Sequence, residues 1–365
     1  MTAGGARAGP AAPHSLSASK PPVAIVLRRG PARAGSVRPM LVAVDARALA
    51  ARRGVARYTR RMLEALAAHA EVRAVVPGRA PVEPVPGVTL VRTAPGSRPL
   101  HAAGALCGRP RIDRLAGGAD VVWLPAPAPC APGARHVLTV HDLSWEQRPK
   151  DFTAYERLWH RLARPRRLAR SAGAVVCDAP AGADLLRGRW GVTARVVEPG
   201  VDHVAASPHP GRYVLYVGAL EPRKGLDVLA EAWARRPLEG TELLVAGEGR
   251  VAVPGARMLG HVDDAQLHAL YAGALAVVLP SHLEGFGLPP REAAAHGTPA
   301  VVSDLPTLRL PGTLRVPPGD AAALAAALAR LPAERARLVA ELAPPRTWAQ
   351  AGAELHAILA EVAAR

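Results

Sequence analysis

Two carboxylates stand eight residues apart in the stretch 279–303, on either side of a bend rich in glycine and proline. Glu284 comes before the bend, and Glu292 follows it on a predicted helix that begins near Pro289 and Pro290. Carboxylates accept hydrogen bonds from sugar hydroxyls, and the free amides of a helix N-terminus attract phosphate. The stretch therefore predicts a site for a molecule with a phosphate and several hydroxyls, such as a nucleotide sugar.

The bend between the two glutamates has a distinctive sequence, which includes GFGLPP. This E-x7-E pattern resembles the signature of family 4 of the retaining glycosyltransferases, and the resemblance extends from about residue 40 to the C-terminus. In that family the first glutamate contacts the donor sugar and the second contacts the nucleotide ribose. The resemblance thus implies those roles for Glu284 and Glu292, with further donor-binding residues in the bend: Gly285, Phe286, Gly287 and Leu288.

A second candidate loop, GALEPRKG over residues 218–225, lies between a predicted strand and a predicted helix. Strand, glycine-bearing loop and helix is a geometry that binds phosphate, and Arg223 and Lys224 add positive charge to it. Lys224 is one of three lysines against 43 arginines, which favours a role for a compact charge. The loop resembles the family's diphosphate-binding segment. Many members have an arginine where this chain has Ala219, so we expect Arg223 to replace it.

The first half of the chain supplies two more candidates. The predicted strand Val137–Val140 ends in His141 and Asp142, at the edge where open α/β sheets bind ligands. The pair resembles the family's HD pair, whose histidine lies near the donor sugar; a helix cap or an ordinary loop histidine is the alternative. Gly54, in the loop after the first strand, resembles a family glycine beside the acceptor, with a plain turn as the alternative.

The segment Met258–Val262 resembles the part of the family that lies beside the nucleobase, which implies contacts from Gly260 and Val262. Asp263 and Asp264 follow it and are predicted to cap a helix rather than to bind a metal. No other group of residues has metal-ligand spacing. We therefore expect neither a metal nor a cofactor beyond the nucleotide-sugar co-substrate, GDP- or UDP-linked.

Short apolar runs alternate with helical or loop segments in two successive sets, which is the pattern of parallel sheets. A length of 365 residues also fits two domains. We predict an α/β fold of two Rossmann-like domains, and the resemblance implies the GT-B architecture, in which their sheets face a central cleft. The predicted divisions are a disordered extension (1–39), an acceptor domain (40–205), a donor domain (206–346) and a helix that packs back on the first domain (347–365).

Two helical segments have further features. The segment Thr153–Ser171 is predicted to be helical with an interruption at Pro165, and its regularly spaced arginines are predicted to share one face: Arg157, Arg161, Arg164, Arg167 and Arg170. Contact with a membrane surface and a solvated face are the two interpretations. Near the C-terminus, separate helices are predicted over residues 321–330 and 333–342.

Composition and charge limit the cellular location and the kinds of partner. No apolar run approaches the roughly 18 residues of a membrane span, and three scattered cysteines suit a reducing cytoplasm. The net charge of +16 belongs to the first half, because residues 206–365 carry 15 cations and 16 acids. The excess favours an anionic partner or a solubilising surface. We predict a cytoplasmic protein, with peripheral contact at the inner face of the membrane as one interpretation. Nucleic acid is disfavoured because no recognition motif is present.

The expected function is that of a retaining, metal-independent glycosyltransferase that moves a hexose from a nucleotide sugar to a glycan or glycolipid. The EPRK loop resembles that of enzymes using GDP-mannose, and a UDP-sugar is the other candidate donor. Three alternatives stay open from the sequence: a retaining glycosidase using Glu284 and Glu292, a sugar-nucleotide epimerase on the same fold, and a non-catalytic nucleotide-sugar binder.

Overall fold

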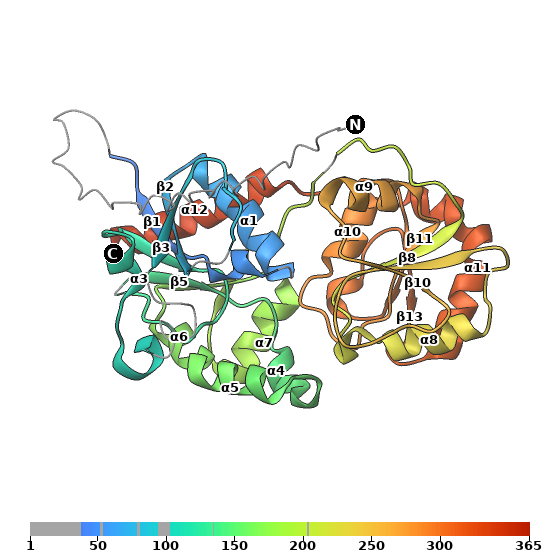
Figure 1. Ribbon diagram of the computed structural model, residues 1–365, viewed down its shortest axis with the longest axis horizontal. Helices are drawn as coiled ribbons and strands as arrows, with labels where there is room; N and C mark the ends of the chain where they lie inside the picture. Colours follow the sequence, from blue (N-terminus) through green and yellow to red (C-terminus); the bar gives the residue numbers. More distant parts are fainter. Residues whose placement is uncertain (1–37, 52–53, 79–80, 94–102, 134, 203) are drawn as a thin grey trace, which may run out of the picture.

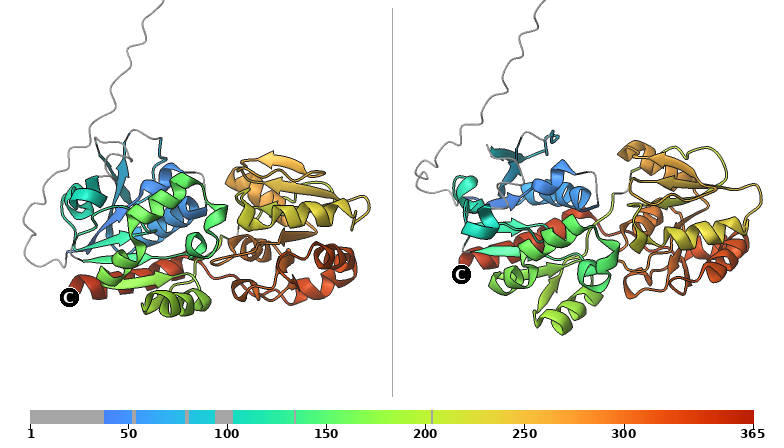
Figure 2. Two further views of the ribbon diagram at one scale, coloured as in Figure 1. Left: turned by 90° about the horizontal axis from the view of Figure 1, so that it is seen from below. Right: turned by 60° about the horizontal axis from the view of Figure 1, so that its bottom comes forward.

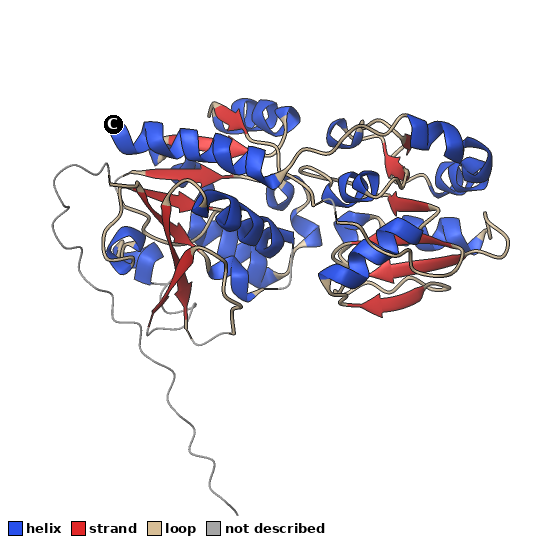
Figure 3. Ribbon diagram, turned by 90° about the horizontal axis from the view of Figure 1, so that it is seen from above, coloured by secondary structure: helices blue, strands red, loops and turns tan. Residues whose placement is uncertain are grey.

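The computed structural model describes residues 38–51, 54–78, 81–93, 103–133, 135–202 and 204–365. These residues form two lobes, each built on a parallel sheet with helices on both faces (Figures 1 and 3). The extension predicted over residues 1–39 lies outside the described residues except for its last two positions. The α/β fold with two Rossmann-like domains is confirmed.

The first lobe holds a seven-stranded sheet in the order β3-β2-β1-β4-β5-β6-β7, and every neighbouring pair is parallel. Its central strands are short apolar runs that are buried throughout, as expected for strands covered on both faces. The bounds are β1 Leu41–Asp45, β2 Glu71–Pro77, β3 Val88–Thr93, β4 Val121–Leu124, β5 His136–Thr139, β6 Ala174–Cys177 and β7 Ala194–Val196.

The second lobe holds a six-stranded sheet in the order β10-β9-β8-β11-β12-β13, again with parallel neighbours. A single hydrophobic cluster of strand and helix side chains forms its core. The bounds are β8 Tyr213–Val217, β9 Glu242–Ala246, β10 Arg257–Gly260, β11 Ala276–Leu279, β12 Ala300–Ser303 and β13 Thr313–Val316.

Helices cover both sheets, and short 3-10 turns shape several of the loops. The first lobe contains α1 Gly54–Ala67, α3 Ile112–Leu115, α4 Ser144–Gln147, α5 Ala154–Ala163, α6 Pro165–Ser171 and α7 Pro180–Trp190, with η1 Arg47–Ala50 and η2 Pro149–Asp151. From residue 206 onward come α8 Leu226–Ala234, α9 Asp264–Gly273, α10 Leu288–Ala295, α11 Ala321–Ala340 and α12 Trp348–Ala364, with η3 Pro222–Lys224 and η4 Pro306–Leu308. Asp263 caps α9 as predicted, since its side chain accepts a hydrogen bond from the Gln266 amide at 2.8 Å.

The strand order reverses at one point in each sheet. In the first lobe β1 lies between β2 and β4, and in the second lobe β8 lies between β9 and β11. Loops on the two sides of such a point leave toward opposite faces of the sheet, which opens a crevice at the carboxyl ends of the strands. The loops after β8 and β11 are therefore the natural place for a ligand in the second lobe.

The last helix, α12, returns to the first lobe, where it lies along α1 (Figure 2). Its apolar side chains belong to the same core cluster as Tyr58 and Met62 of α1: Trp348, Leu355, Ile358, Leu359 and Val362. Gly352 makes this close approach possible, because a Cβ added there would lie 2.4 Å from the Ala65 Cβ. The chain thus crosses between the lobes twice.

Two helix predictions were wrong. The arginines of residues 153–171 do not share one face, because Arg164 is left-handed (φ 45°) between α5 and α6. Pro165 disfavours the helical conformation for the residue before it, and this breaks the helical phase. The helices predicted over 321–330 and 333–342 are one helix, α11, which continues through Pro332. Leu331 and Leu338 are fully buried on either side of that proline, so packing outweighs the lost hydrogen bond.

Among the described residues, no helix has both the length and the apolar character needed to cross a bilayer.

Two glycines inside helices should respond in opposite directions to the same substitution. Gly352→Ala places a methyl group against Ala65 and should cost about 1–3 kcal/mol of unfolding free energy through overpacking. Gly188→Ala in α7 meets no atom within 4 Å, so it should stabilise the helix by about 0.5–1 kcal/mol. Thermal denaturation of both variants measures the contrast, and a stabilised Gly352→Ala variant would contradict the described docking of α12.

Candidate functional site

The loops after β8 and β11 are joined to each other, as expected for neighbouring strands at the point where strand order reverses. Gly225 ends the first loop with φ 66°, and a Cβ there would lie 2.0 Å from the Pro280 carbonyl oxygen. The amide of His282 donates to the carbonyl oxygen of Arg223 at 2.9 Å. These contacts fix Arg223 and Lys224 beside the loop that carries Glu284.

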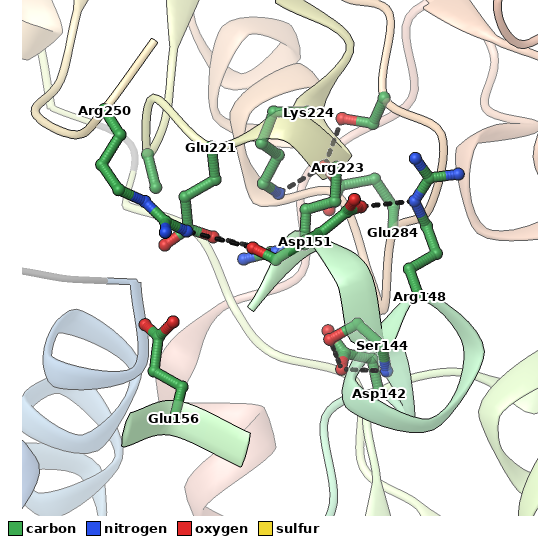
Figure 4. A network of polar contacts seen from close by, with 12 residues as sticks. Asp142, Ser144, Arg148, Asp151, Glu156, Glu221, Arg223, Lys224, Arg250 and Glu284 are labelled. Carbon is green, nitrogen blue, oxygen red and sulfur yellow. Dashed lines mark hydrogen bonds and ion pairs between the residues drawn. The ribbon is translucent and has the colours of Figure 1, made fainter. Parts of the chain in front are cut away.

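Lys224 and Glu284 form an ion pair at the centre of this arrangement (Figure 4). The ammonium Nζ of Lys224 donates to Glu284 Oε1 at 2.6 Å, and the hydroxyl of Ser281 donates to the same oxygen at 2.7 Å. Both charged side chains are mostly buried, with exposed fractions of 14% and 8%. The pair therefore presents a fixed cation and a fixed carboxylate at the carboxyl edge of the second sheet.

Arg223 faces the first lobe. Its Nε donates to Glu221 at 3.0 Å. Burial alone would lower the pKa of the Arg223 guanidinium, but Asp142 and two glutamates outweigh burial and raise it. Burial alone would likewise raise the pKa of Asp142, yet Arg223 and two hydrogen bonds from Ser144 hold it low. Arg223 and Asp142 thus stabilise each other's charge across the two lobes, and Figure 4 shows both residues.

The bend between the two glutamates touches the first lobe directly. A Cβ added to Gly285 would lie 2.3 Å from the carbonyl oxygen of His141, so only glycine fits at this approach. Gly287 precedes α10 with φ 79°. The ring of Phe286 is buried, with the Arg291 guanidinium 3.8 Å from its centroid. The Phe286 carbonyl also accepts a hydrogen bond from Arg291 at 2.8 Å, so Phe286 shapes the bend.

Glu292 is held from both lobes. Its Oε2 accepts a hydrogen bond from the buried Tyr271 hydroxyl at 2.7 Å, and its Oε1 lies 3.0 Å from Nη1 of Arg57. Arg57 lies in the first turn of α1, in the opposite lobe. Burial would lower the pKa of Arg57, but Glu292 and other acids outweigh burial and raise it. The buried carboxylate thus has a cationic partner across the lobe junction.

The remaining predicted residues lie apart from these contacts. Gly54 is the first residue of α1, and a Cβ there would meet no atom within 4 Å. Gly260 ends β10 with φ 66°, and its carbonyl accepts from the Gly247 amide at 2.8 Å. Val262 packs against the core of the second lobe. The contacts described for Gly260 and Val262 stay within the second lobe. The predicted residues that the structure brings together at the lobe junction are His141, Asp142, Arg223, Lys224, Glu284, Gly285 and Glu292.

Sequence reasoning missed several residues of the junction. Arg57 could have been found from its place just after Gly54, on the first turn behind the first strand. Asp178 follows β6 directly, as the predicted His141–Asp142 pair follows β5, and it lies 2.7 Å from His141. Tyr271 has no such signal, because only the packing of α9 on α10 brings it to Glu292. Arg250 also crosses the junction, donating to the Asp151 carbonyl at 3.0 Å (Figure 4).

Within the described ranges, no three or more His, Cys, Asp or Glu side chains gather as a metal site would require.

Comparison with known families agrees with this geometry. Residues 52–204 match the profile described as Glycosyltransferase Family 4, and residues 211–334 match that described as Glycosyl transferases group 1. The two matches run consecutively through both lobes. The architecture is that of the GT-B class, and the two matches together support a family 4-like glycosyltransferase.

Characterised relatives match over parts of the chain. The glycogen synthase of Mycobacterium tuberculosis is 39% identical over 130 residues, 30% of this chain and 31% of that protein. A phosphatidyl-myo-inositol mannosyltransferase of Mycobacterium leprae is 38% identical over 148 residues, 35% of this chain and 39% of that protein. The D-rhamnosyltransferase WbpZ of Pseudomonas aeruginosa is 30% identical over 258 residues, 59% and 64% of the two chains. The chain thus spans about a third of the first two relatives.

Solved structures share the fold over nearly the whole chain. Sucrose-phosphate synthase from Thermosynechococcus elongatus superimposes with a TM-score of 0.62 at 20% identity, covering 90% of this chain and 97% of that one. The Anabaena protein HepE, solved with UDP and glucose, has a TM-score of 0.60 at 16% identity, covering 90% and 98%. At these identities the likeness establishes the fold alone.

A matched pair of substitutions on α1 measures how much the contact between Arg57 and Glu292 contributes to stability. Arg57→Ala removes the cation from a buried carboxylate and should cost about 1–3 kcal/mol of stability. Arg60→Ala, on the same helix, removes contacts that stay within the first lobe and should cost no more than about 0.5 kcal/mol. Thermal unfolding measures both losses, and equal losses would show that the cross-lobe pair adds nothing.

Proposed function

We propose that this chain is a retaining, metal-independent glycosyltransferase that moves a hexose from a nucleotide sugar to a glycan or glycolipid acceptor. The observation that carries the proposal is the junction itself. Lys224, Arg223 and Glu284 stand at the carboxyl ends of two adjacent strands, with His141 and Asp142 opposite them. The matches to two glycosyltransferase profiles support the reaction class.

The proposed chemistry is stabilisation of a leaving group. When the anomeric C–O bond of the donor breaks, negative charge develops on the diphosphate and the sugar becomes oxocarbenium-like. Lys224, Arg223 and the free amides at the start of α10 meet that charge with donors that are already oriented. Gly287 supplies no side-chain cap to those amides. In the proposed roles Glu284 binds the donor sugar, Glu292 the ribose, and the departing phosphate oxygen takes the acceptor's proton.

The proposed donor is GDP-mannose, and a UDP-sugar is the second candidate. The mannosyltransferase from Mycobacterium leprae supports the first, because it is among the matched relatives. The Anabaena neighbour with UDP and glucose supports the second. Gly260 and Val262, at the end of β10 and just after it, are proposed to lie beside the base.

One alternative, the glycosidase, is disfavoured by specific contacts. A glycosidase needs one carboxyl group as a neutral proton donor, usually in an apolar setting. Here Glu284 and Glu292 each pair with a cation within 3.0 Å. A sugar-nucleotide epimerase or a non-catalytic binder remains compatible with the fold, and the reaction products separate these from a transferase.

The decisive experiment offers the protein GDP-, UDP-, ADP- and dTDP-sugars and then adds candidate acceptors. Thermal shift identifies the nucleotide that binds, and chromatography identifies what is formed. Release of nucleoside diphosphate together with a glycosylated acceptor supports the proposal. Interconversion of the sugar nucleotide, or binding without turnover, would replace it with the epimerase or the binder.

The two glutamates should separate chemistry from binding. Glu284→Ala removes the carboxylate that faces the donor sugar, so it should abolish transfer and leave affinity for the nucleoside diphosphate within about threefold. Glu292→Ala removes the ribose contact and should weaken nucleotide affinity by roughly tenfold or more. Calorimetric titration and turnover measured on both variants test the assignment. It is wrong if Glu284→Ala retains full activity.

We also propose a cytoplasmic location with peripheral membrane contact through the first lobe. On α5 three large apolar side chains are exposed beside Arg157 and Arg161: Tyr155 at 54%, Leu158 at 51% and Leu162 at 36%. An amphipathic basic helix of this kind binds anionic lipid surfaces. The protein should sediment with phosphatidylglycerol vesicles, and the Leu158→Glu variant should stay in the supernatant. Leu106→Glu, at another exposed leucine outside α5, is the control. Binding unaffected by Leu158→Glu would exclude this surface.

A further inference from the structure

His141 and Asp178 are brought together by the register of the first sheet. Thr139 of β5 pairs with Val176 of β6, and His141 and Asp178 each lie two positions beyond those partners. Nδ1 of His141 lies 2.7 Å from Oδ2 of Asp178. Asp178 is buried, with 4% of its surface exposed, so the carboxylate lies behind the imidazole rather than in solvent.

The imidazole is also packed inside the first lobe, close to the lobe junction. The Tyr58 ring packs edge-on against it, with centroids 4.6 Å apart. The backbone carbonyl of His141 is the group that Gly285 of the second lobe approaches. Nε2 of His141 is buried and has no hydrogen bond of normal geometry, although the Pro125 carbonyl also acts on the ring. A buried donor without a partner is costly, so this nitrogen is suited to a polar atom supplied by a bound molecule.

A carboxylate on Nδ1 determines what the second nitrogen can do. It accepts the Nδ1–H bond, which orients the ring, and it stabilises the imidazolium form, in which Nε2 also carries a proton. Carboxylates that orient histidines in this way act through the histidine and do not touch the substrate. None of the roles that the family resemblance implies falls on position 178.

We propose that Asp178 is a positioning residue that holds His141 as an imidazolium, with Nε2–H donating to an oxygen of the bound nucleotide sugar. This inference rests on the proposed function. His141 would then add a third cation to the site, on the side opposite Lys224 and Arg223. The charge of His141 comes from the first lobe. All three cations therefore act on the donor only when both lobes contact it.

The groups around His141 are consistent with a charged ring. Burial alone would lower the pKa of His141, but Asp178, Asp142 and the Pro125 carbonyl outweigh it and raise the pKa. Burial raises the pKa of Tyr58 well above its usual value, so its phenol stays neutral. Burial also raises the pKa of the Cys177 thiol to about 11. Arg223 of the second lobe acts on Asp142 rather than on the ring.

Asp178→Asn tests the inference, because it keeps the shape and one acceptor oxygen but removes the charge. In the wild type, His141 stays protonated toward higher pH. In the variant its pKa should fall. At a pH above both pKa values, kcat should then drop about tenfold for each unit of that fall, and it should recover at acid pH. Asp184→Asn, the same change at an exposed position on α7, should leave the pH profile unchanged.

A second readout does not depend on turnover. Nuclear magnetic resonance of histidine-labelled protein, with the signal assigned through His141→Gln, gives the pKa of His141 directly in the wild type and in Asp178→Asn. A lower pKa in the variant, together with the shifted activity profile, supports the inference. An unchanged pKa and an unchanged profile overturn it, even if the variant is less stable. If no donor is turned over by the wild type, the proposed function fails, and with it the catalytic part of this inference.

Should Asp178→Asn not fold, stability of the wild type and of His141→Gln across pH supplies the test. A raised pKa in the folded state stabilises the protein fully below the unfolded pKa of histidine and loses that stabilisation as pH rises through the folded value. The stability advantage of the wild type over His141→Gln should therefore shrink between these two pKa values. A constant difference would overturn the inference.

Discussion

A buried carboxylate determines where the two lobes meet. Glu292 lies at the second lobe's face, almost inaccessible to water, and a carboxylate in that setting requires a cation and hydrogen bonds. Tyr271 supplies a hydrogen bond from within the lobe, but the cation, Arg57, comes from the other lobe. The second lobe is therefore electrostatically incomplete alone. Glu292 thus belongs both to the contact with the first lobe and to the candidate site.

Sheet topology explains why the other candidate groups gather at that place. The loops after β8 and β11 begin on neighbouring strands. The close packing of Gly225 and a hydrogen bond from the His282 amide hold them together, so Lys224 reaches Glu284. In the first lobe the same rule holds for β5 and β6, whose register sets His141 against Asp178. Only glycine permits the final approach, since a Cβ at position 285 would lie 2.3 Å from the carbonyl oxygen of His141. Parallel strand ends thus supply groups from both sides of the junction.

Much of this arrangement could be predicted from the sequence. Apolar runs identified the buried strands, and the spacing of Glu284 and Glu292 around a glycine-rich bend identified the loop after β11. What failed was long-range. Arg57 is 235 positions from Glu292, and a local sequence pattern cannot predict an ion pair between residues so far apart. The break at Arg164 and the continuous α11 through Pro332 show that a proline's effect depends on the packing around it.

The contacts of Glu292 also bear on how a donor would enter. A carboxylate has about four acceptor positions, and Arg57 and Tyr271 use one on each oxygen. Two positions therefore remain, which is the number that a ribose with two hydroxyls can use. Arg57 does not have to leave when ribose binds, because the same carboxylate can serve both. A nucleotide in the proposed place would then share Glu292 with the first lobe, so that binding the donor and holding the lobes together would depend on one side chain.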